Sequence, residues 1–173
     1  MAHAMRDELD VDRYSLLPSA RNVRRRIASQ GLATVFGEAF DEIDTYQRST
    51  PSDDYLSRLL TKQHFIAVVA MNGSEVVGGL AAYELDKFEQ DRREIYIYDL
   101  AVMEKHRRRG VATGLTGELR KIASERNVSV IFVQADMEDS PAIALYESLG
   151  TKETAYHFDI EVPAHPIAIA SRT

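Results

Sequence analysis

The segment from Arg107 to Thr113, RRRGVAT, has the residue types of a small anion-binding site. It follows an apolar, β-branched and aromatic run from Ile95 to Val102 and the charged loop MEKH, and apolar residues then recur at helical spacing. A strand, a short basic loop and a helix gather backbone N–H groups at the helix N-terminus, where the positive end of the helix dipole also lies. We therefore expect a phosphate or pyrophosphate to bind there.

The position of its glycine separates this segment from two common phosphate-binding loops. The chain contains neither G-x-x-x-x-G-K-[ST], the motif of nucleoside-triphosphate P-loops, nor G-x-G-x-x-G, the motif of dinucleotide folds. Its own pattern is R-x-x-G-x-A, formed by Arg107, Gly110 and Ala112. Glycine lets the backbone approach an anion closely and alanine adds little bulk. The alternative interpretation is a plain strand–helix connection with solvated arginines.

Composition limits the class of protein to which the chain belongs. With 173 residues, 45% of them hydrophobic, and no apolar run of 18, we expect one globular domain and no membrane span. The N-terminus MAHAMRDELD lacks an apolar stretch, so we expect no secretory signal. A chain without cysteine has no disulfide, no thiolate metal site and no thiol nucleophile, which fits the cytoplasm. The predicted domain, 12–162, lies between a flexible lead, 1–11, and a tail, 163–173.

The charge distribution favours small charged ligands over nucleic acids. The formal net charge is −6, yet residues 105–109 are strongly basic. An acidic body suits a cationic substrate and disfavours general nucleic-acid binding, whereas the local basic segment suits a small polyanion. The triplet Arg24–Arg26 has the composition of a nucleic-acid-binding motif, but on an amphipathic helix we interpret it as a solvated face. We expect a small-molecule partner, with no nucleic acid and no membrane.

Hydrophobic periodicity predicts an α/β architecture with a mixed sheet. Asn72-Gly73 between two apolar runs predicts a hairpin, and the strand beginning at Glu94 pairs back on it as an antiparallel meander. The β-branched run Val128–Val133 follows a helix directly and predicts a strand parallel to Ile95–Val102. The predicted strands are 14–17, 65–71, 75–83, 94–102, 128–133 and 155–160, and the predicted helices are 21–40 with a break at Gly31, and three beginning at Ser52, Val111 and Ser140.

Small and polar residues mark where these elements begin, end and touch. Ser52 and Ser140 are the predicted N-caps of two helices, and Asn127 is expected to end the helix that begins at Val111. Gly78 and Gly79, inside a strand, leave room for a close approach of backbone or ligand.

Residues Asp99–Ala112, DLAV followed by a four-residue loop and R-x-x-G-x-A, resemble the acetyl-coenzyme A motif of the GNAT N-acetyltransferases. From about Leu32 to Ile160 the chain is similar to the class I aminoglycoside 3-N-acetyltransferases, the gentamicin-modifying group. The fragments that carry this resemblance, in order, are PSDDYLSRLL, KQHFIAVVA, GGLAAY, KFEQ, EIYIYDLAV, HRRRGVAT, VQAD, PAIALYESLG and HFDI.

The resemblance implies a fold, a reaction and partners. The fold is the GNAT acyl-CoA N-acyltransferase fold, an antiparallel meander followed by a parallel strand pair that is splayed at the cofactor site. The reaction uses acetyl-CoA, without a metal, to acetylate the 3-amino group of a 2-deoxystreptamine aminoglycoside. Acetylation removes a positive charge that the drug needs to bind ribosomal RNA, so antibiotic resistance follows. The resemblance also implies a homodimer.

Acetyl transfer first requires that the chain bind the cofactor. The amides near Gly110 are candidates for its pyrophosphate, and a backbone N–H released by a splay or a bulge could meet the negative charge on the thioester carbonyl. In the family this N–H lies at the end of the motif strand, which implicates Leu100 and Val102. The predicted cofactor-binding residues are Leu100, Ala101, Val102, Arg107, Arg108, Arg109, Gly110, Val111, Ala112 and Thr113.

The acceptor amine must lose a proton and the leaving thiolate needs one. Asp99 is the predicted base because no structural reason explains a charge in an otherwise apolar strand; the alternative is a carboxylate satisfied by backbone donors or an arginine. Related GNAT enzymes often carry a glutamate three residues earlier, where this chain has Tyr96, and Glu94 is the second candidate. Tyr146 falls where the family places its tyrosine general acid.

Several carboxylates are needed to recognise a polycation. The predicted substrate-binding residues, from three segments of the chain, are Asp53, Asp54, Glu94, Asp136, Glu138 and Asp139. Asp53 and Asp54 would also stabilise the first turn of a helix.

Two other functions stay open: acetylation of polyamines or another small amine, and a non-catalytic acyl-CoA-binding domain.

Overall fold

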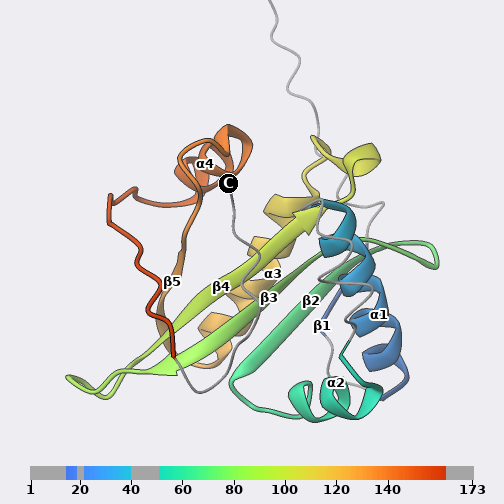
Figure 1. The fold of residues 1–173 in the computed structure, drawn as a ribbon, viewed down its shortest axis with the longest axis horizontal. Helices are drawn as coiled ribbons and strands as arrows, with labels where there is room; N and C mark the ends of the chain where they lie inside the picture. The colour runs from blue at the N-terminus through green and yellow to red at the C-terminus, as the bar shows by residue number, and fades with distance from the viewer. Residues whose placement is uncertain (1–14, 19–21, 40–50, 163–173) are drawn as a thin grey trace, which may run out of the picture.

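The computed structural model describes residues 15–18, 22–39 and 51–162 and places them in one sheet with helices on both faces (Figure 1). The elements are β1 (Ser15–Pro18), α1 (Asn22–Ala39), α2 (Asp53–Leu59), β2 (Phe65–Asn72), β3 (Glu75–Asp86), β4 (Arg93–Val102), the 3-10 turn η3 (Glu104–His106), α3 (Val111–Glu125), β5 (Val128–Val133) and α4 (Ser140–Leu149). The predicted lead and tail, Tyr14 and the side chains of Arg24–Arg26 lie outside the described residues.

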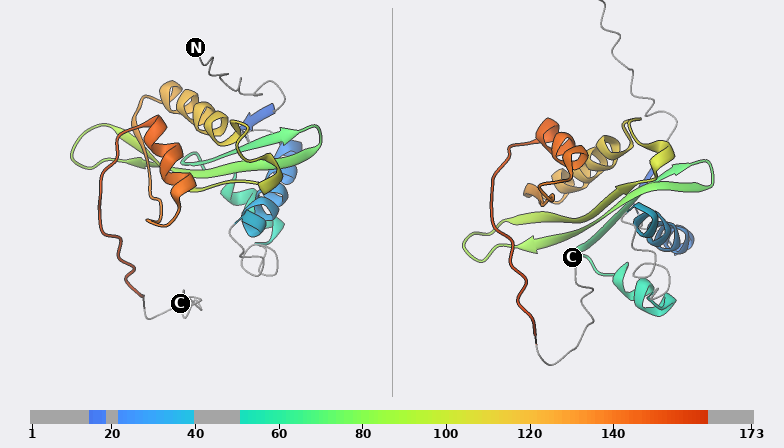
Figure 2. Two further views of the ribbon diagram at one scale, coloured as in Figure 1. Left: turned by 90° about the horizontal axis from the view of Figure 1, so that it is seen from above. Right: turned by 45° about the horizontal axis from the view of Figure 1, so that its top comes forward.

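The sheet has five strands in the order β1-β2-β3-β4-β5. Strands β1 to β4 are antiparallel neighbours, and β5 is parallel to β4. The prediction of an antiparallel meander followed by a parallel pair is therefore confirmed. In Figure 2, α1 and α2 cover one face of the sheet, and α3 and α4 lie on the other.

Alternating residues of β4 face these two helical layers. Ile95 and Ile97 belong to a core cluster with Leu115 and Leu119 of α3. Asp99 pairs with Ala81, which packs in the second cluster with α1, so Asp99 lies on the α1 face. No helix in the described part of the chain is long and apolar enough to cross a bilayer.

Glycines let both helical layers approach the sheet closely. A Cβ at Gly79 would lie 2.1 Å from Leu32 Cδ2 of α1, and one at Gly78 would lie 3.2 Å from Val111 Cγ1 at the start of α3. The predicted close approach at these positions is confirmed. The missing side chain of Gly78 lets the N-terminus of α3 pack closely against the end of β4, because a Cβ at Gly78 would also lie 3.1 Å from the carbonyl oxygen of Ala101.

Most helix ends follow the prediction. Ser52 caps α2, since its Oγ accepts a hydrogen bond from the Tyr55 amide at 3.2 Å. Asn127, with φ 55°, follows the end of α3. However, Asp139 rather than Ser140 caps α4, because its Oδ1 accepts from the Ala142 amide at 3.0 Å.

Two further predictions of local structure were wrong. Gly31 does not break α1, which is continuous from Asn22 to Ala39. A Cβ there would lie 2.4 Å from Val76 Cγ2, so the glycine serves packing against the sheet. The strand predicted at 155–160 does not form: the segment has no regular secondary structure and is exposed. Its alternating pattern has no strand beside it to supply hydrogen-bond partners within the described residues.

Candidate active site

The parallel strands β4 and β5 separate half-way along β4. β4 pairs with β3 through Val102, but it pairs with β5 only from Arg93 to Ile97. On the side of β5, the backbone polar groups from Tyr98 to Val102 therefore face no strand of the described structure. This geometry confirms the expected splay, and it lies directly before the basic loop.

A β-bulge marks the point of separation. Ala81 pairs with Asp99 and Ala82 pairs with Ile97, which leaves Tyr98 as the extra residue of β4. A bulge redirects side chains at functional sites, and the Tyr98 side chain is 65% exposed. Asp99 itself is half-buried and lies at the start of the splayed stretch.

Tyrosines to which the sequence analysis gave no role surround Asp99. The ring centroids of Tyr83 and Tyr98 lie 6.0 Å apart, and those of Tyr96 and Tyr98 lie 5.8 Å apart. Burial raises the pKa of Tyr83 and of Tyr96, and the charge of Asp99 contributes to the rise in both. The Asp99 carboxylate is therefore close to two phenols. Spacing by two along β4 indicates that Tyr96 and Tyr98 share a face, but it puts Asp99 on the opposite face, and only the bulge brings Asp99 to the tyrosines.

The basic loop turns into α3 through two residues of left-handed conformation. Arg108 has φ 60° and Gly110 has φ 77°. Only glycine adopts such a conformation without steric cost, which explains the glycine of the R-x-x-G-x-A pattern. The loop is anchored to the strand by Arg107, whose Nε donates to the carbonyl oxygen of Val102 at 3.0 Å.

The N-terminus of α3 presents backbone amides at the end of this loop. Gly110 is the N-cap and provides no side-chain cap, and its carbonyl accepts the first helical bond from Gly114 at 2.8 Å. The amides of Val111, Ala112 and Thr113 therefore have no acceptor within the helix. Together with the exposed guanidinium groups of Arg107–Arg109, they have the donors and the positive charge that bind a pyrophosphate.

Tyr146 lies on α4, the helix that follows β5. Burial raises its pKa to about 12, and the negative charge of Asp139 adds to the rise. The phenol is therefore fully protonated at neutral pH. The Arg120 guanidinium donates to the carbonyl of Leu149 and so ties the end of α4 to α3.

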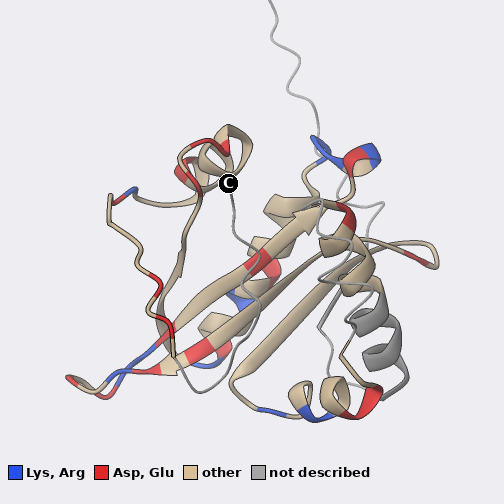
Figure 3. Ribbon diagram, in the orientation of Figure 1, with Lys and Arg blue, Asp and Glu red and all other residues tan. Residues whose placement is uncertain are grey.

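Two of the predicted acceptor segments are exposed in the structure. Asp136 and Glu138 are exposed in the loop after β5, at the same end of the sheet as the basic loop (Figure 3). Asp139, by contrast, already caps α4. Asp53 and Asp54 are exposed in the first turn of α2, on the same face of the sheet as Asp99.

Glu94 lies apart from the other predicted site residues. It is near the start of β4, with its carboxylate 3.3 Å from Arg92 Nη2 and 3.5 Å from Lys87 Nζ. Five residues of strand separate it from Asp99, roughly 16 Å at 3.3 Å per residue. The structure therefore does not bring Glu94 to the splay.

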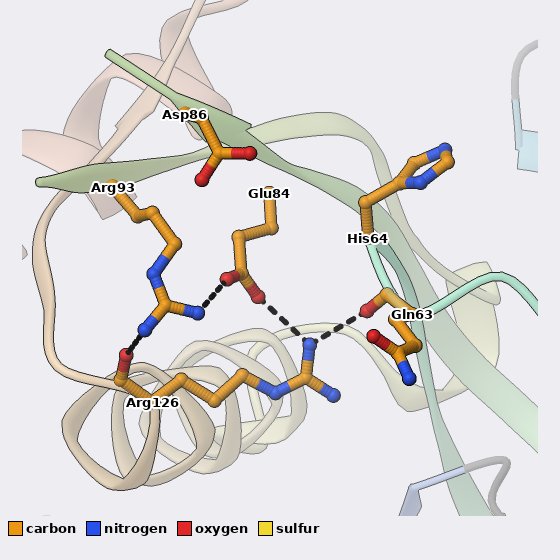
Figure 4. Close-up of a pocket in the computed structure, with 6 residues that line it drawn as sticks. All are labelled: Gln63, His64, Glu84, Asp86, Arg93 and Arg126. Carbon is orange, nitrogen blue, oxygen red and sulfur yellow. Dashed lines mark hydrogen bonds and ion pairs between the residues drawn. The ribbon is translucent and has the colours of Figure 1, made fainter. Parts of the chain in front are cut away.

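A pocket of about 500 Å³ lies at this opposite end of β4 (Figure 4). It is lined by Gln63, His64, Glu84, Asp86, Arg93 and Arg126. The Glu84 carboxylate binds Arg93 at 2.5 Å and Arg126 at 2.8 Å, and Arg126 also donates to the carbonyl of Gln63 at 2.8 Å. Burial favours a higher pKa for Glu84, but the hydrogen bonds and charges of Arg126 and Arg93 outweigh it and hold the pKa below its usual value. We interpret the pocket as a structural junction.

Residues 24–151 match the acetyltransferase (GNAT) family. The chain belongs to the GNAT acetyltransferase family. This family uses acetyl-CoA, and the residues after β4 fit that ligand, since a glycine at positive φ and amides without helical acceptors lie at one helix N-terminus.

Similar proteins include both eukaryotic and metagenomic acetyltransferases. This GNAT chain is 31% identical to N-acetyltransferase family 8 member 2 of Rattus norvegicus over 91 residues, 52% of the chain and 40% of the relative, so it spans less than half of that relative's length. It is 49% identical to the crystal structure of an aminoglycoside acetyltransferase from an uncultured soil metagenomic sample, with a TM-score of 0.82 over 86% of this chain and 98% of that chain. A second such enzyme, in complex with trehalose, is 25% identical, with a TM-score of 0.70 over 87% of this chain and 97% of that chain.

Proposed function

We propose that this GNAT protein transfers the acetyl group of acetyl-CoA to the 3-amino group of 2-deoxystreptamine aminoglycosides of the gentamicin type, and so confers resistance to them. The observation that carries the proposal is the splay of β4 from β5 beside Asp99, followed directly by the amides at the start of α3. The short distance along the chain between Asp99 and these amides supports a base beside the cofactor. The 49% identity to a solved aminoglycoside acetyltransferase supports the class of acceptor.

Backbone groups hold and polarise the donor in this proposal. The amides of Val111–Thr113 and the guanidinium groups of Arg107–Arg109 bind the pyrophosphate. Backbone N–H groups in the splayed stretch, at Leu100 and Val102, donate to the thioester carbonyl oxygen as negative charge develops there. Acetyl-CoA supplies the activated acetyl group, and no metal or protein nucleophile is required.

Asp99 is the proposed base. It accepts a proton from the acceptor ammonium, directly or through a water molecule, so that the free amine can form the amide bond as the carbon–sulfur bond breaks. Its position at the first residues of the splay supports this role. Glu94, the second candidate, is held by Arg92 and Lys87 at the other end of the strand.

Tyr146 is proposed to stabilise the leaving sulfur. With a pKa of about 12, its phenol is a weaker acid than a thiol, whose pKa is about 8.5. Complete proton transfer to the thiolate is therefore uphill, and the phenol acts mainly as a hydrogen-bond donor to the sulfur. Solvent supplies the final proton when one is needed.

Exposed carboxylates from two sides recognise the cationic acceptor in this proposal. Asp136 and Glu138 follow β5, and Asp53 and Asp54 begin α2, so the two groups come from different elements. Tyr98, exposed at the bulge, offers an aromatic face for a sugar ring or an ammonium group.

We also propose that residues 12–162 form one catalytic domain. In this proposal the domain works as a homodimer in the cytoplasm, where acetyl-CoA is available.

The direct test is thiol release from acetyl-CoA with gentamicin as acceptor. Because the chain contains no cysteine, the protein adds no thiol of its own to this assay. We expect kcat/KM for gentamicin to exceed that for spermidine at least 100-fold, and fragmentation mass spectrometry with NMR to place the acetyl group on the 3-amino nitrogen. A higher kcat/KM for spermidine would instead support the polyamine alternative, and binding of coenzyme A without turnover of either amine would support the non-catalytic one.

A further inference from the structure

A side-chain hydrogen bond links the two parallel strands at the point where they separate. The hydroxyl of Tyr96 on β4 donates to Oε1 of Gln134, the first residue after β5, at 3.0 Å. Backbone pairing between the two strands ends with Ile97 and Val133. The bond between Tyr96 and Gln134 therefore lies at the apex of the splay, where Gln134 is exposed.

Aromatic neighbours hold the ring of Tyr96 in place beside this bond. Phe132, its register partner on β5, stacks on it with the ring centroids 5.0 Å apart and the ring planes at 23° to each other. Tyr98 contacts the same ring edge-on, with a centroid distance of 5.8 Å. Because the Tyr96 ring is half-buried and held on two sides, its phenolic oxygen has a defined position at the apex of the splay.

Tyr96 lies on the same face of the sheet as Asp99. Their register partners on β3, Tyr83 and Ala81, are two residues apart and therefore share a face. Because of the bulge, Tyr96 and Asp99 occupy neighbouring positions of that face, roughly 7 Å apart along the strand. Burial raises the pKa of Tyr96, and the charges of Tyr98 and Asp99 add to the rise, so the phenol keeps its proton at neutral pH.

The direction of the hydrogen bond decides what the phenol can offer to a ligand. A phenol has one proton to donate, and its oxygen can also accept. Because Gln134 receives that proton, the capacity that remains at the Tyr96 oxygen is to accept a hydrogen bond. A primary ammonium group has three N–H donors and no acceptor. An accepting oxygen next to the carboxylate of Asp99 is therefore complementary to such a group.

We propose that Tyr96 binds the amino group that is to be acetylated. Its phenolic oxygen accepts one N–H of that group while the Asp99 carboxylate receives another, and Gln134 is the positioning residue that keeps the oxygen in its accepting orientation. Tyr96 itself exchanges no proton, because its own proton stays on the bond to Gln134. A tertiary amine offers one N–H in its charged form and leaves one of the two acceptors unpaired, so the arrangement selects primary amines. This assignment rests on the proposed function.

Tyr96→Phe tests the contact, because it removes the oxygen and keeps the ring that stacks on Phe132. We expect the Kd for gentamicin, measured by calorimetry with coenzyme A present, and the KM for gentamicin to rise roughly 10–100-fold, as for loss of a hydrogen bond to a charged group. The kcat should fall less than about threefold, and the Kd for coenzyme A should not change, since the contact is made before the chemical step.

Ser129→Ala is the matched control for a bond that merely joins the strands. Ser129 Oγ donates to the carbonyl oxygen of Arg93 at 2.9 Å, so it also links β5 to β4, at the amino end of the pair. This variant should leave the Kd and the KM for gentamicin within about twofold of wild type.

Two variants of Gln134 test the orientation of the phenol. Gln134→Glu keeps an oxygen that accepts from the phenol, so gentamicin should bind within about threefold of wild type or more tightly. Gln134→Leu removes that acceptor and should weaken binding as much as Tyr96→Phe does, and the double variant should bind no more weakly than Tyr96→Phe alone. Because Gln134 is exposed, its variants report on the contact even if Tyr96→Phe fails to fold.

The outcomes separate this assignment from the proposed function. An unchanged Kd for gentamicin in folded Tyr96→Phe would overturn the assignment, and so would an equal loss in Ser129→Ala or wild-type binding by Gln134→Leu. Weaker binding by Tyr96→Phe, with no acetyl transfer by the wild type, would support the assignment and count only against the proposed function. Absence of gentamicin binding by folded wild-type protein would overturn both.

Discussion

The two ends of β4 are built from similar residues and differ in how their polar groups are satisfied. At the amino end, Arg93 binds Glu84, and Arg126 from the end of α3 binds the same carboxylate. At the carboxyl end, about 30 Å away along the strand, arginines also gather, but Arg107–Arg109 are exposed beside the first amides of α3.

The difference supports the carboxyl end as the place of the proposed chemistry. Glu84 neutralises the arginines of the amino end from within the protein, so that end joins β2, β3, β4 and α3. At the carboxyl end, β4 has a bulge and splays away from β5, and no side chain caps the N-terminus of α3. The amides of Val111, Ala112 and Thr113 at this end have no acceptor within α3. A pocket alone would have directed attention to the amino end, whereas the distribution of satisfied and unsatisfied donors favours the carboxyl end.

Asp99→Asn should give the largest functional loss at the carboxyl end. We expect kcat/KM for gentamicin to fall about 10²–10⁴-fold, as for removal of a general base, while the Kd for coenzyme A changes less than about twofold. The amide is isosteric, so the fold should be unchanged. Glu94→Gln is the control from the amino end and should stay within about threefold of wild type. A larger loss from Glu94→Gln than from Asp99→Asn would reverse the assignment.

Tyr146→Phe should have a smaller effect. Removing a hydrogen bond to a charged sulfur costs about 1.5–3 kcal/mol, which corresponds to a fall in kcat of roughly 10–150-fold. Because burial and Asp139 raise the pKa of Tyr146 to about 12, its titration should cause no loss of wild-type activity below about pH 10. Tyr156→Phe serves as a control for an exposed phenol. A wild-type decline near pH 8–9 that disappears in Tyr146→Phe would contradict this assignment.

Glu84→Gln should affect stability and leave catalysis unchanged. We expect a loss of about 1–3 kcal/mol in the free energy of unfolding at pH 7, measured by urea denaturation, with kcat/KM within about twofold of wild type. The folded-state pKa of Glu84 lies below its usual 4.5, so its ion pairs stabilise the fold above that pH and the contribution is lost as pH falls through the folded-state pKa. The difference in the free energy of unfolding between wild type and Glu84→Gln should therefore become smaller below about pH 4.5.

A surface ion pair provides the comparison for that measurement. Glu75 and Lys105 lie 2.6 Å apart with side chains 47% and 59% exposed. Glu75→Gln should leave the free energy of unfolding almost unchanged, because exposed pairs are solvated and screened. An equal loss of unfolding free energy in Glu75→Gln and Glu84→Gln would show that the ion pairs of Glu84 stabilise the fold no more than an exposed pair does.

Local signals in the sequence were sufficient for the elements that surround the site. β-branched runs and Asn72-Gly73 predicted the strands and the hairpin, and the residues before and after Gly110 predicted the strand, loop and helix of the candidate cofactor site. The same signals could not give the register of β3 against β4. That register depends on a bulge at Tyr98, which no residue type marks, and it decides that Asp99 lies on the α1 face.

Predictions failed where a residue served more than one purpose. Gly31 has the composition of a helix break, yet its lack of a side chain admits Val76. Ser140 was predicted to cap α4, but Asp139 caps it, because a carboxylate just before a helix competes with serine for the same amide. The 155–160 pattern is strand-like, but a strand also needs a neighbour to pair with, and this segment has none within the described residues.

The central claim is that the amides after Gly110 bind the diphosphate of coenzyme A, and calorimetry on paired glycine variants tests it most directly. Gly110 and Gly73 both have positive φ, 77° and 61°, so valine at either site should cost a similar 1–2 kcal/mol of stability. We predict that wild type and Gly73→Val bind coenzyme A with the same Kd, whereas Gly110→Val binds at least 100-fold more weakly. Unchanged binding by Gly110→Val, or no binding by folded wild-type protein, would contradict the account.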